Sequence, residues 1–349
     1  MIPEKMKAVV IDKANHAEVR EMTTPRPASG EILVRVEKAL ICTWEQRIFQ
    51  GIDMPLPYVP GHEISGVVAE IGEDTFTDVK VGDKVVVKTY DSCGQCENCY
   101  RGFDNLCTGK KKGRVYDGIP GTGGFAQYLA IASDRVYPLP GGNKIDLETA
   151  AFAEPCACVI NSIEQADIQL GEDVVIVGGG IMGQLHNLLA KKRGARTIVA
   201  EPDPARRQMA LDMGADYAFD SIAEDPVEKI MELTNGVGAH VCFYTVNVIP
   251  LAQTYIETLA KRGRMIYYGS FHPSGPIDVE PNKIHYSEKR LMGAYSPTAK
   301  GFWTASHLLG HGLIDVAPFI TEKYSMDDCQ KALERACSPE TYRVLIDLN

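Results

Sequence analysis

The sequence has no uninterrupted apolar run of about 18 residues, the length that a helix needs to cross a bilayer, so we expect no membrane span. It has no excess of basic residues: 36 Lys and Arg against 46 Asp and Glu give a formal net charge of −10, which argues against nucleic acid and anionic membranes as partners. It has no internal repeats, and its first ten residues lack the long apolar core and the cleavage site of a secretory signal. These absences predict a cytoplasmic globular protein.

The composition fits such a protein. The 349 residues are 45% hydrophobic and 23% charged, which suggests about two domains with a sizeable core. Ten cysteines without a secretory signal fit a reducing compartment, where thiols serve metals rather than disulfides. Five of them have no role in the motifs below, and we expect them to be small buried hydrophobic residues: Cys156, Cys158, Cys242, Cys329 and Cys337.

The pattern of the chain changes near residue 150. Residues 1–150 contain short β-rich runs punctuated by Gly and Pro, which predicts a compact, mostly β domain resembling a small barrel. Residues 151–296 alternate strand and helix, which predicts an α/β domain with a doubly wound parallel sheet. We expect residues 297–349, with a helix and a closing strand, to fold back onto the first domain. The strands expected in the α/β domain are Val174–Val177, Thr197–Ala200, Tyr217–Phe219, His240–Tyr244 and Arg264–Tyr268, with helices at Ile181–Arg193 and Asp203–Met213.

Four cysteines stand close together in the β-rich part: Cys93, Cys96, Cys99 and Cys107. Four thiolates in one short loop supply every ligand of a tetrahedral zinc site. Such a closed site leaves no position for a substrate. We therefore expect a structural zinc in this loop.

A glycine-rich motif follows the strand Val174–Val177 and begins a helix: Gly178, Gly179, Gly180, Ile181, Met182 and Gly183. This fits G-x-G-x-x-G, in which a pyrophosphate rests on the N–H groups of the helix N-terminus. Glu201 ends the next strand, where a carboxylate binds ribose hydroxyls and repels a 2′-phosphate, so we expect NAD rather than NADP. Arg206 and Arg207 are the counter-argument, since they could flank the adenine or bind a phosphate.

A second possible metal set lies outside the cysteine cluster. Cys42, His62 and a carboxylate, either Glu63 or Glu154, are the ligand types of a catalytic zinc, which keeps one position for substrate or water. Taken alone, a cysteine or histidine is more often a buried residue than a ligand. The glycines around His62, in the run Gly61–Gly72, suit strand ends that pack tightly against a site.

With these motifs in place, the chain resembles the zinc-containing medium-chain dehydrogenase/reductases of the alcohol dehydrogenase superfamily. It is most similar to the branch of sorbitol and other polyol dehydrogenases and L-threonine 3-dehydrogenase. The resemblance covers essentially the whole chain. It rests on the four-cysteine loop and the glycine motif, and on the segments Pro27–Val36, Gly61–Glu63, Val81–Val85, Gly123–Tyr128, Ala153–Pro155 and Arg262–Ile266.

This resemblance implies a GroES-like catalytic domain at residues 1–150, completed by residues 297–349, and a Rossmann domain at residues 151–296. It implies that zinc lowers the pKa of a substrate hydroxyl and that a hydride passes to the nicotinamide. It also implies a small-molecule substrate and a homodimer or homotetramer. Within the Rossmann domain it places Tyr244, Gly269 and Ser270 with the coenzyme.

The chain departs from the family pattern after Cys42, where it reads Thr43-Trp44-Glu45-Gln46-Arg47. Trp44 replaces the hydroxyl that relays the alcohol proton, and Arg47 replaces the histidine at the far end of that relay. We therefore expect the proton to leave through Glu63, Glu154 or a substrate hydroxyl. Glu45 stands where an aspartate steadies the ligand histidine.

Two of these departures bear on the substrate. Trp44 offers a flat face for a sugar or cyclitol ring, or simply narrows the pocket. Arg47 could bind an acidic substituent of the substrate.

The sequence leaves several functions open. The first is an NAD-dependent dehydrogenase that acts on a secondary alcohol of a polyol, sugar or sugar derivative. The second is a zinc enzyme that borrows NAD for elimination or epimerisation. The third is an amino-alcohol dehydrogenase of the L-threonine type. A binding protein that only kept the fold is a fourth reading, and the intact Cys42, His62 and Glu63 argue against it.

Overall fold

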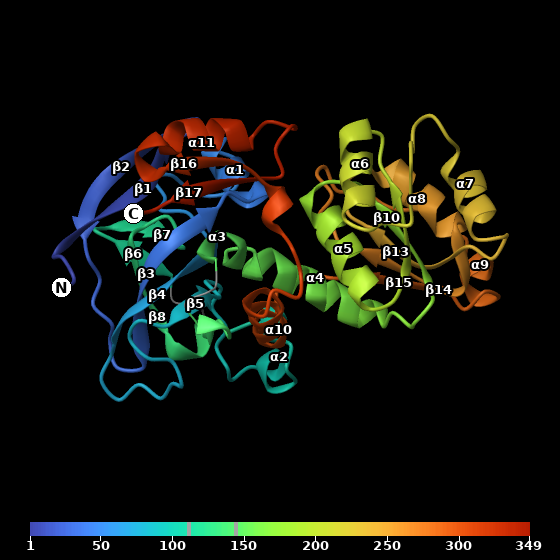
Figure 1. The fold of residues 1–349 in the computed structure, drawn as a ribbon. Helices are drawn as coiled ribbons and strands as arrows, with labels where there is room; N and C mark the ends of the chain where they lie inside the picture. Colours follow the sequence, from blue (N-terminus) through green and yellow to red (C-terminus); the bar gives the residue numbers. More distant parts are fainter. Residues whose placement is uncertain (110–112, 143–145) are drawn as a thin grey trace. The chain divides into compact units, whose positions relative to one another are not determined.

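A computed structural model describes residues 1–109, 113–142 and 146–349. Two compact units account for these residues (Figure 1). Unit 1 consists of Met1–Ala157 and Pro297–Asn349, and unit 2 consists of Cys158–Ser296. No helix among the described residues is long and apolar enough to cross a bilayer.

Unit 1 is built around a mixed sheet with the strand order β16-β17-β3-β4-β5-β9, and β8 also pairs with β3. β16 and β17 are parallel to each other, while the pairings from β17 to β9 are antiparallel. Two further two-stranded sheets are β1-β2 and β6-β7. The strands are β1 (Lys5–Lys13), β2 (His16–Thr23), β3 (Glu31–Leu40), β4 (Glu63–Ile71), β5 (Lys84–Val87), β6 (Arg114–Tyr116), β7 (Ile119–Gly121), β8 (Tyr128–Ala132), β9 (Val136–Pro138), β16 (Ile320–Ser325) and β17 (Arg343–Asp347).

The apolar side chains of these strands bury a common core in unit 1, to which both ends of the chain contribute. Val9, Val34 and Ile346, from β1, β3 and β17, all belong to this core and are fully buried. The helices are α1 (Thr43–Phe49), α2 (Glu97–Tyr100), α3 (Leu147–Ala150), α4 (Ala153–Ala166, which continues into unit 2), α10 (Ala299–Gly310) and α11 (Cys329–Ala336), with 3₁₀ turns at Asp104–Leu106, Ser133–Arg135, Ala317–Phe319 and Met326–Asp328.

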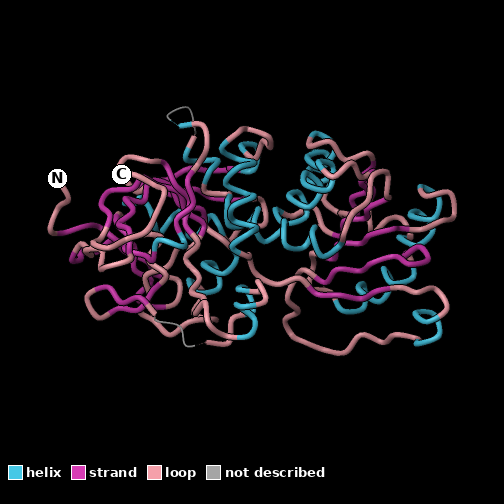
Figure 2. Tube along the Cα trace, turned by 90° about the horizontal axis from the view of Figure 1, so that it is seen from below, coloured by secondary structure: helices cyan, strands magenta, loops and turns pink. Residues whose placement is uncertain are grey.

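Unit 2 is a six-stranded parallel sheet in the order β12-β11-β10-β13-β14-β15. Numbered within the unit this is 3-2-1-4-5-6, the doubly wound order, which reverses between β10 and β13. Helices lie on either side of the strands in Figure 2. The elements are β10 (Asp173–Val177), α5 (Ile181–Lys192), β11 (Arg196–Ala200), α6 (Pro204–Asp212), β12 (Tyr217–Phe219), α7 (Pro226–Leu233), β13 (Ala239–Tyr244), α8 (Ile249–Glu257), β14 (Leu259–Tyr267), α9 (Pro281–His285) and β15 (Arg290–Gly293).

The five strands and two helices predicted in unit 2 are confirmed within a residue or two at most ends. The exception is β14, which begins at Leu259 rather than Arg264. Leu259 pairs with Ala239, but the register with β13 then shifts, and Arg262 has a positive φ of 61°. This irregularity interrupts the apolar pattern, so the sequence shows only the second half of the strand. Of the five cysteines expected to be buried, Cys156, Cys242 and Cys329 are buried, and Cys158 and Cys337 are half-buried.

A buried histidine in α5 links the stability of unit 2 to pH. His186 Nδ1 lies 2.7 Å from Met182 O, and its Nε2 lies 3.0 Å from Ser162 Oγ. The neutral ring satisfies both contacts, since Nδ1 donates and Nε2 accepts. Burial lowers the pKa of His186 to about 4, although the bond to Met182 opposes this shift. The folded pKa is therefore below the unfolded value of about 6.5.

Because the pKa of His186 is lower in the folded protein than in the unfolded chain, the protein should become less stable as the pH falls. The stabilisation is present above pH 6.5 and is lost as the pH falls towards 4, by about 2 kcal/mol between pH 7 and pH 5. Urea denaturation at the two pH values should show this loss in the wild type and a smaller one in His186→Gln. The exposed His285→Gln is the matched control and should behave like the wild type. Equal pH sensitivity of wild type and His186→Gln would contradict the assignment.

Candidate metal and coenzyme sites

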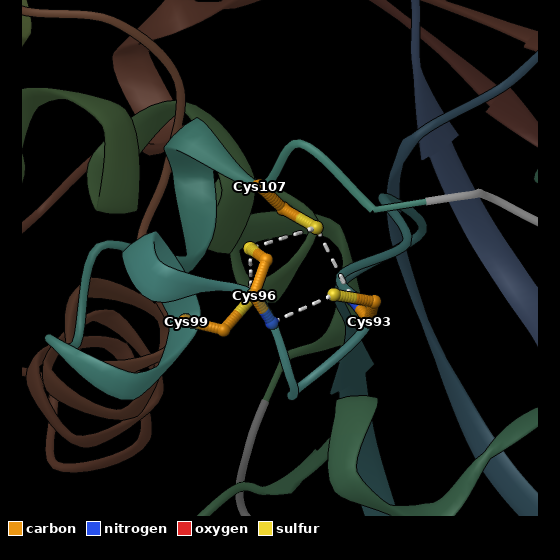
Figure 3. Close-up of side chains that lie close together, drawn as sticks. All are labelled: Cys93, Cys96, Cys99 and Cys107. Carbon is orange, nitrogen blue, oxygen red and sulfur yellow. Dashed lines mark hydrogen bonds between the residues drawn. The ribbon is translucent and has the colours of Figure 1, made fainter.

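The four-cysteine loop of unit 1 brings its sulfur atoms together (Figure 3). The ligand atoms of Cys93, Cys96, Cys99 and Cys107 all lie within 4.8 Å of one another. Cys96 Sγ is 3.6 Å from Cys99 Sγ and 3.9 Å from Cys107 Sγ. A tetrahedral zinc with Zn–S bonds of about 2.3 Å requires S···S distances of about 3.8 Å. The donor set therefore fits a closed zinc site.

Backbone N–H groups around the loop favour the thiolate form that a metal needs. The N–H of Cys96 donates to Cys93 Sγ at 3.3 Å, and the N–H of Cys93 donates to Cys107 Sγ at 3.2 Å. Hydrogen bonds from the backbone of Cys99 and Thr108 lower the pKa of Cys96 to about 5. An anionic sulfur is already favoured at this position before a metal binds.

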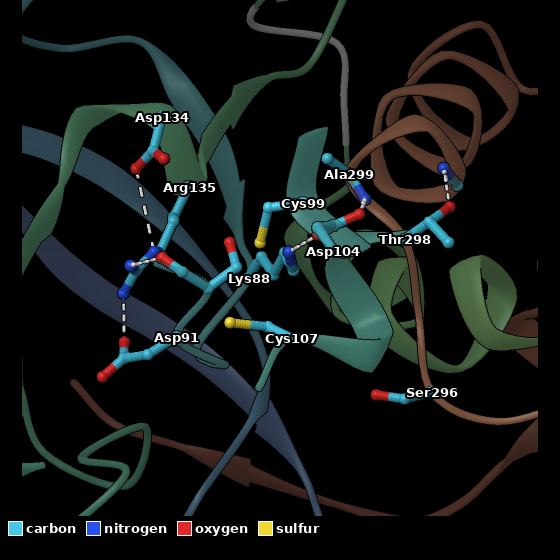
Figure 4. Close-up of polar contacts among 12 residues, drawn as sticks. Lys88, Asp91, Cys99, Asp104, Cys107, Asp134, Arg135, Ser296, Thr298 and Ala299 are labelled. Carbon is cyan, nitrogen blue, oxygen red and sulfur yellow. Dashed lines mark hydrogen bonds and ion pairs between the residues drawn. The ribbon is translucent and has the colours of Figure 1, made fainter. Parts of the chain in front are cut away.

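Buried ion pairs hold the loop against the rest of unit 1 (Figure 4). The Asp104 carboxylate, between Cys99 and Cys107, accepts from Lys88 Nζ and from the backbone N–H of Ala299 at the start of α10. Asp91, just before Cys93, pairs with Arg114 and Arg135. Lys88 is only 3% exposed, and Asp104 is the ion-pair partner that compensates its buried charge. The four-cysteine loop thus holds the first residue of α10 in place through Asp104.

The second set of ligand atoms meets where β3 ends and β4 begins. The two strands are antiparallel, and Leu40 at the end of β3 pairs with Glu63 at the start of β4. Cys42 follows β3 and is the N-cap of α1, while His62 precedes β4. The ligand atoms of Cys42, His62 and Glu63 lie within 4.8 Å of one another. This is a Cys/His/carboxylate set of the type that a catalytic zinc uses.

A glycine makes this approach possible. Gly61 has φ +102°, and a Cβ there would lie 2.4 Å from Phe125 N. Only glycine tolerates both conditions without strain. The turn that delivers His62 to the site therefore requires Gly61.

Glu45 hydrogen-bonds to two residues of this Cys/His/carboxylate set, Cys42 and His62, and its contact with His62 was predicted from the sequence. Its Oε1 lies 2.5 Å from His62 Nδ1 and accepts from Gly61 N at 3.2 Å, while its Oε2 accepts from Cys42 N at 3.1 Å. A carboxylate accepts, so Nδ1 carries the proton and Nε2 keeps its lone pair for a metal. Burial disfavours a charged His62, but the charge of Glu45 and hydrogen bonds to Cys42 and Glu45 raise its pKa well above the usual range. Metal binding at Nε2 must therefore displace a proton.

Arg343, at the start of β17, holds the carboxylate of Glu63, a pairing that was not predicted from the sequence. Its Nε donates to Glu63 Oε2 at 2.8 Å and its Nη2 to Oε1 at 2.7 Å. Nη2 is also 3.7 Å from Cys42 Sγ. The side chains of Glu63 and Arg343 are 0% and 2% exposed, so this is a fully buried bidentate ion pair. Strand pairing explains its position, since Ile41 N donates to Val344 O.

Burial raises the pKa of Cys42, and the neighbouring Glu63 raises it further, whereas Arg343 lowers it. The guanidinium therefore offsets part of the negative charge of a Cys42 thiolate and a Glu63 carboxylate. With a divalent cation added, the set of Cys42, His62, Glu63 and Arg343 would carry an excess of positive charge. Such a site favours an anionic oxygen at the open position.

Three further residues were predicted around this site: Trp44, Glu154 and Arg47. Trp44 meets His62 edge to face, with ring centroids 5.4 Å apart, so its indole does lie beside the metal set. Glu154, in the first turn of α4, is buried in the same unit, and its charge acts on Arg343 and Cys156.

Arg47 donates to Asp53 through Nε at 2.6 Å and Nη2 at 2.7 Å. The expected guanidinium for an acidic substrate is thus already neutralised by a carboxylate.

In unit 2 the glycine motif has the predicted placement between β10 and α5. Gly178 has φ +100°, and a Cβ on Gly183 would lie 1.9 Å from Gly178 O, so helix and turn pack at a distance that only glycine allows. Gly180 is the N-cap of α5, and Ile181 and Met182 form its first turn. The next acidic residue, Glu201, is 5% exposed and accepts from Gly179 N at 2.5 Å and from Asp203 N at 2.9 Å. The motif and the carboxylate therefore lie side by side.

Of the remaining coenzyme predictions, the one for Tyr244 is wrong. Its side chain is 0% exposed, donates to Val248 O and stacks on Phe271. β13 is a central strand covered on both faces, so even its last side chain is in the core.

Gly269 and Ser270 follow β14, and Gly269 N donates to Tyr244 O at the same end of the strands as Gly178. Arg206 is half-buried in α6, and Gln184 Nε2 donates to its backbone oxygen.

Comparison with known proteins agrees with this geometry. Residues 28–141 match the alcohol dehydrogenase GroES-like domain, and residues 182–309 match the family described as zinc-binding dehydrogenase. The chain is 32% identical to 2-dehydro-3-deoxy-L-galactonate 5-dehydrogenase of Pseudoalteromonas atlantica, with 93% of each protein covered. It is 31% identical to sorbitol dehydrogenase of Halalkalibacterium halodurans, covering 98% of this chain and 99% of the relative. The chain belongs to the zinc-containing alcohol dehydrogenase superfamily, the medium-chain dehydrogenase/reductases.

Two further relatives extend the comparison. L-threonine 3-dehydrogenase of Pyrococcus furiosus is 30% identical, with 99% of each protein covered. A zinc-binding dehydrogenase of Sinorhizobium meliloti, crystallised with NADP, superposes with a TM-score of 0.89 at 27% identity, over 99% of this chain and 100% of that one.

The dehydrogenase is therefore an NAD(P)-dependent zinc enzyme with a GroES-like unit and a Rossmann unit. The two metal sets and the glycine motif are the features of this chain that fit zinc and a nicotinamide dinucleotide. Arg343 is the residue of this candidate site that was not predicted from the sequence. The only sequence signal for it is a charged residue at the head of an apolar strand, Arg343-Val344-Leu345-Ile346, and that signal does not say which carboxylate it meets.

Proposed function

We propose that this dehydrogenase transfers a hydride between NAD(H) and a secondary alcohol or ketone of a polyol, sugar or sugar derivative. The observation that carries the proposal is the cluster of the half-buried Cys42 with the buried His62 and Glu63, which could supply three ligands to a zinc ion and would leave a fourth position for the substrate oxygen. Relatives named for a sugar acid, for sorbitol and for D-arabitol phosphate support the substrate class.

Each residue of the site has a separate task in this proposal. Zinc, when bound, supplies Lewis acidity that favours the alkoxide form of the substrate hydroxyl. Glu45 fixes the ring of His62, and Arg343 fixes Glu63 and balances its charge. The indole of Trp44, beside His62, offers an apolar face to the C–H side of a sugar ring.

We further propose that the coenzyme is NAD rather than NADP. The Glu201 carboxylate is buried beside Gly179, where a ribose 2′-phosphate would meet a negative charge. The NADP found in the Sinorhizobium meliloti structure makes this a question for measurement. A ratio of kcat/KM that favours NADP would contradict the proposal.

Dehydrogenation of an amino alcohol is the second candidate. It is favoured by the identity of 30% to the L-threonine 3-dehydrogenase of Pyrococcus furiosus over 99% of both proteins. The two candidates differ in what the substrate carries beside its hydroxyl. An ammonium group needs an anionic partner, whereas a polyol needs hydroxyl-binding groups and an apolar ring face.

The test is NADH formation by the zinc-loaded protein over a panel of polyols, sugars, sugar acids, L-threonine and simple secondary alcohols. We expect turnover of at least one polyol or sugar derivative, with NAD preferred to NADP. Turnover of L-threonine alone would select the second candidate. Tightly retained NAD without net NADH on any alcohol would instead indicate that the coenzyme is only borrowed during elimination or epimerisation.

The assembly and the compartment belong to the same proposal. We propose a homodimer or homotetramer in the cytoplasm, as the family resemblance implies. The ten cysteines are all free thiols, which fits a reducing compartment. Light scattering of the purified protein should give two or four times the chain mass of 38.2 kDa, and a monomer would contradict the proposal.

A further inference from the structure

Unit 2 contains a polar pocket at the edge of its sheet opposite the glycine motif. It holds about 330 Å³. The motif follows the carboxyl end of β10, whereas this pocket lies where β10, β13 and β15 begin. The lining residues are Asp167, Gln169, Glu172, His240, Lys261, Arg262, Arg264 and Arg290. The pocket is therefore separate from the coenzyme site.

The charge of the pocket is opposite to that of the chain. Four cations and two carboxylates line it, a formal balance of 4 − 2 = +2 in a chain of −10. Within the described part of the chain Arg262 pairs only with Glu288, and both side chains are more than two-thirds exposed, so water weakens this pair. Lys261 and Arg290 have no carboxylate partner among the described residues. Three exposed cations that line the pocket thus have little compensating negative charge.

Arg264 adds a buried donor that lacks an acceptor. The residue is 8% exposed. Its Nη2 donates to Glu172 Oε2 at 2.5 Å and its Nη1 to Asp167 O at 3.3 Å. Its Nε is buried and has no hydrogen-bond partner among the described residues. A buried donor without an acceptor costs about 1–3 kcal/mol, so the site is incomplete as it stands.

We propose that this pocket binds a small phosphate-bearing anion. Guanidinium groups match the oxygens of a phosphate, and a lysine adds a point charge. The volume is at the lower end of the range for ligand pockets and suits a phosphate on a short carbon skeleton. Such a ligand neutralises the excess charge of Lys261, Arg262 and Arg290 and brings acceptor oxygens to the edge where Arg264 Nε lacks one.

The test uses the zinc-loaded, full-length protein with saturating NAD, which fills the pyrophosphate site at the glycine motif. Melting temperature is followed against inorganic phosphate and against glycerol 3-phosphate, at constant ionic strength. Because Arg264→Gln could prevent folding, the exposed positions are changed instead, in Lys261→Gln, Arg290→Gln and the double variant. Lys192→Gln, an exposed lysine on α5 of the same unit, is the matched control.

We expect a saturable rise in melting temperature with at least one probe. The apparent Kd of that probe should be raised about tenfold or more in the double variant and should keep its wild-type value in Lys192→Gln. A rise at lower concentrations of glycerol 3-phosphate than of phosphate assigns the site to organic phosphomonoesters, and the reverse assigns it to free phosphate. No saturable rise with either probe, or a rise that survives unchanged in the double variant, overturns the proposal.

Discussion

Replacing Arg343 by methionine is expected to lower the free energy of unfolding of the metal-free protein by about 3–5 kcal/mol. The guanidinium is the bidentate partner of Glu63, and both side chains are buried. Methionine fills similar space but leaves an uncompensated carboxylate. The loss should be smaller in the zinc-loaded protein, where the metal gives Glu63 another partner. Urea denaturation of both forms measures the difference.

A surface pair provides the matched control. Arg335 pairs with Glu322, and the two side chains are 38% and 27% exposed, so Arg335→Met should cost no more than about 1 kcal/mol. Adding Glu63→Gln to Arg343→Met removes the stranded charge and should recover part of the stability. If Arg343→Met costs no more than Arg335→Met, the ion pair does not hold Glu63 as described.

Replacing Cys42 by serine is expected to reduce kcat/KM by about 10³-fold or more, on whichever alcohol the dehydrogenase oxidises. Lewis-acid stabilisation of the alkoxide is worth several kcal/mol, and each 1.36 kcal/mol is about tenfold in rate. Serine keeps the size of the side chain but is a much weaker zinc ligand. The assay is NADH formation with zinc in the buffer. NAD affinity should stay near the wild-type value, because the glycine motif lies in unit 2.

Cys337→Ser is the control for a cysteine that holds no metal. Cys337 is a half-buried free thiol of unit 1 and lies in neither ligand set. This variant should keep most of the activity. A Cys42→Ser protein that retains a tenth or more of the wild-type kcat/KM would show that Cys42 is not a ligand of the catalytic metal.

Local sequence patterns correctly predicted the features that are formed by residues close together in the sequence. The strand Val174–Val177, the glycines after it and the helix after them are one continuous signal, and the structure reproduces it as β10, Gly178–Gly183 and α5. The four cysteines are likewise close in sequence, so their cluster needed no knowledge of the fold. Glu45 lies beside His62, as the family resemblance implied, and the short helix α1 fixes its distance from Cys42.

The sequence did not predict contacts that depend on tertiary structure. These contacts join residues that are distant in the sequence, or they arise because a sheet is covered on both faces. Arg343 meets Glu63 only because β17 pairs with β3 at the level of Leu40, which no local pattern reports. The family resemblance placed Tyr244 with the coenzyme, yet packing on both faces of β13 buries its side chain. Arg47 was considered as a residue that could bind an acidic substituent of the substrate, but its guanidinium pairs with Asp53, six residues later in the chain.

The most direct test of the account is the zinc content per chain, measured by elemental analysis, in the wild type, Cys42→Ser, Cys99→Ser and Cys337→Ser. The two ligand sets predict two zinc ions in the wild type and in Cys337→Ser, and one in Cys42→Ser and in Cys99→Ser. The ion retained by Cys42→Ser should leave the protein folded but inactive. A wild type that holds one zinc, or a Cys42→Ser protein that holds two, would contradict the claim that one closed and one open zinc site coexist in this chain.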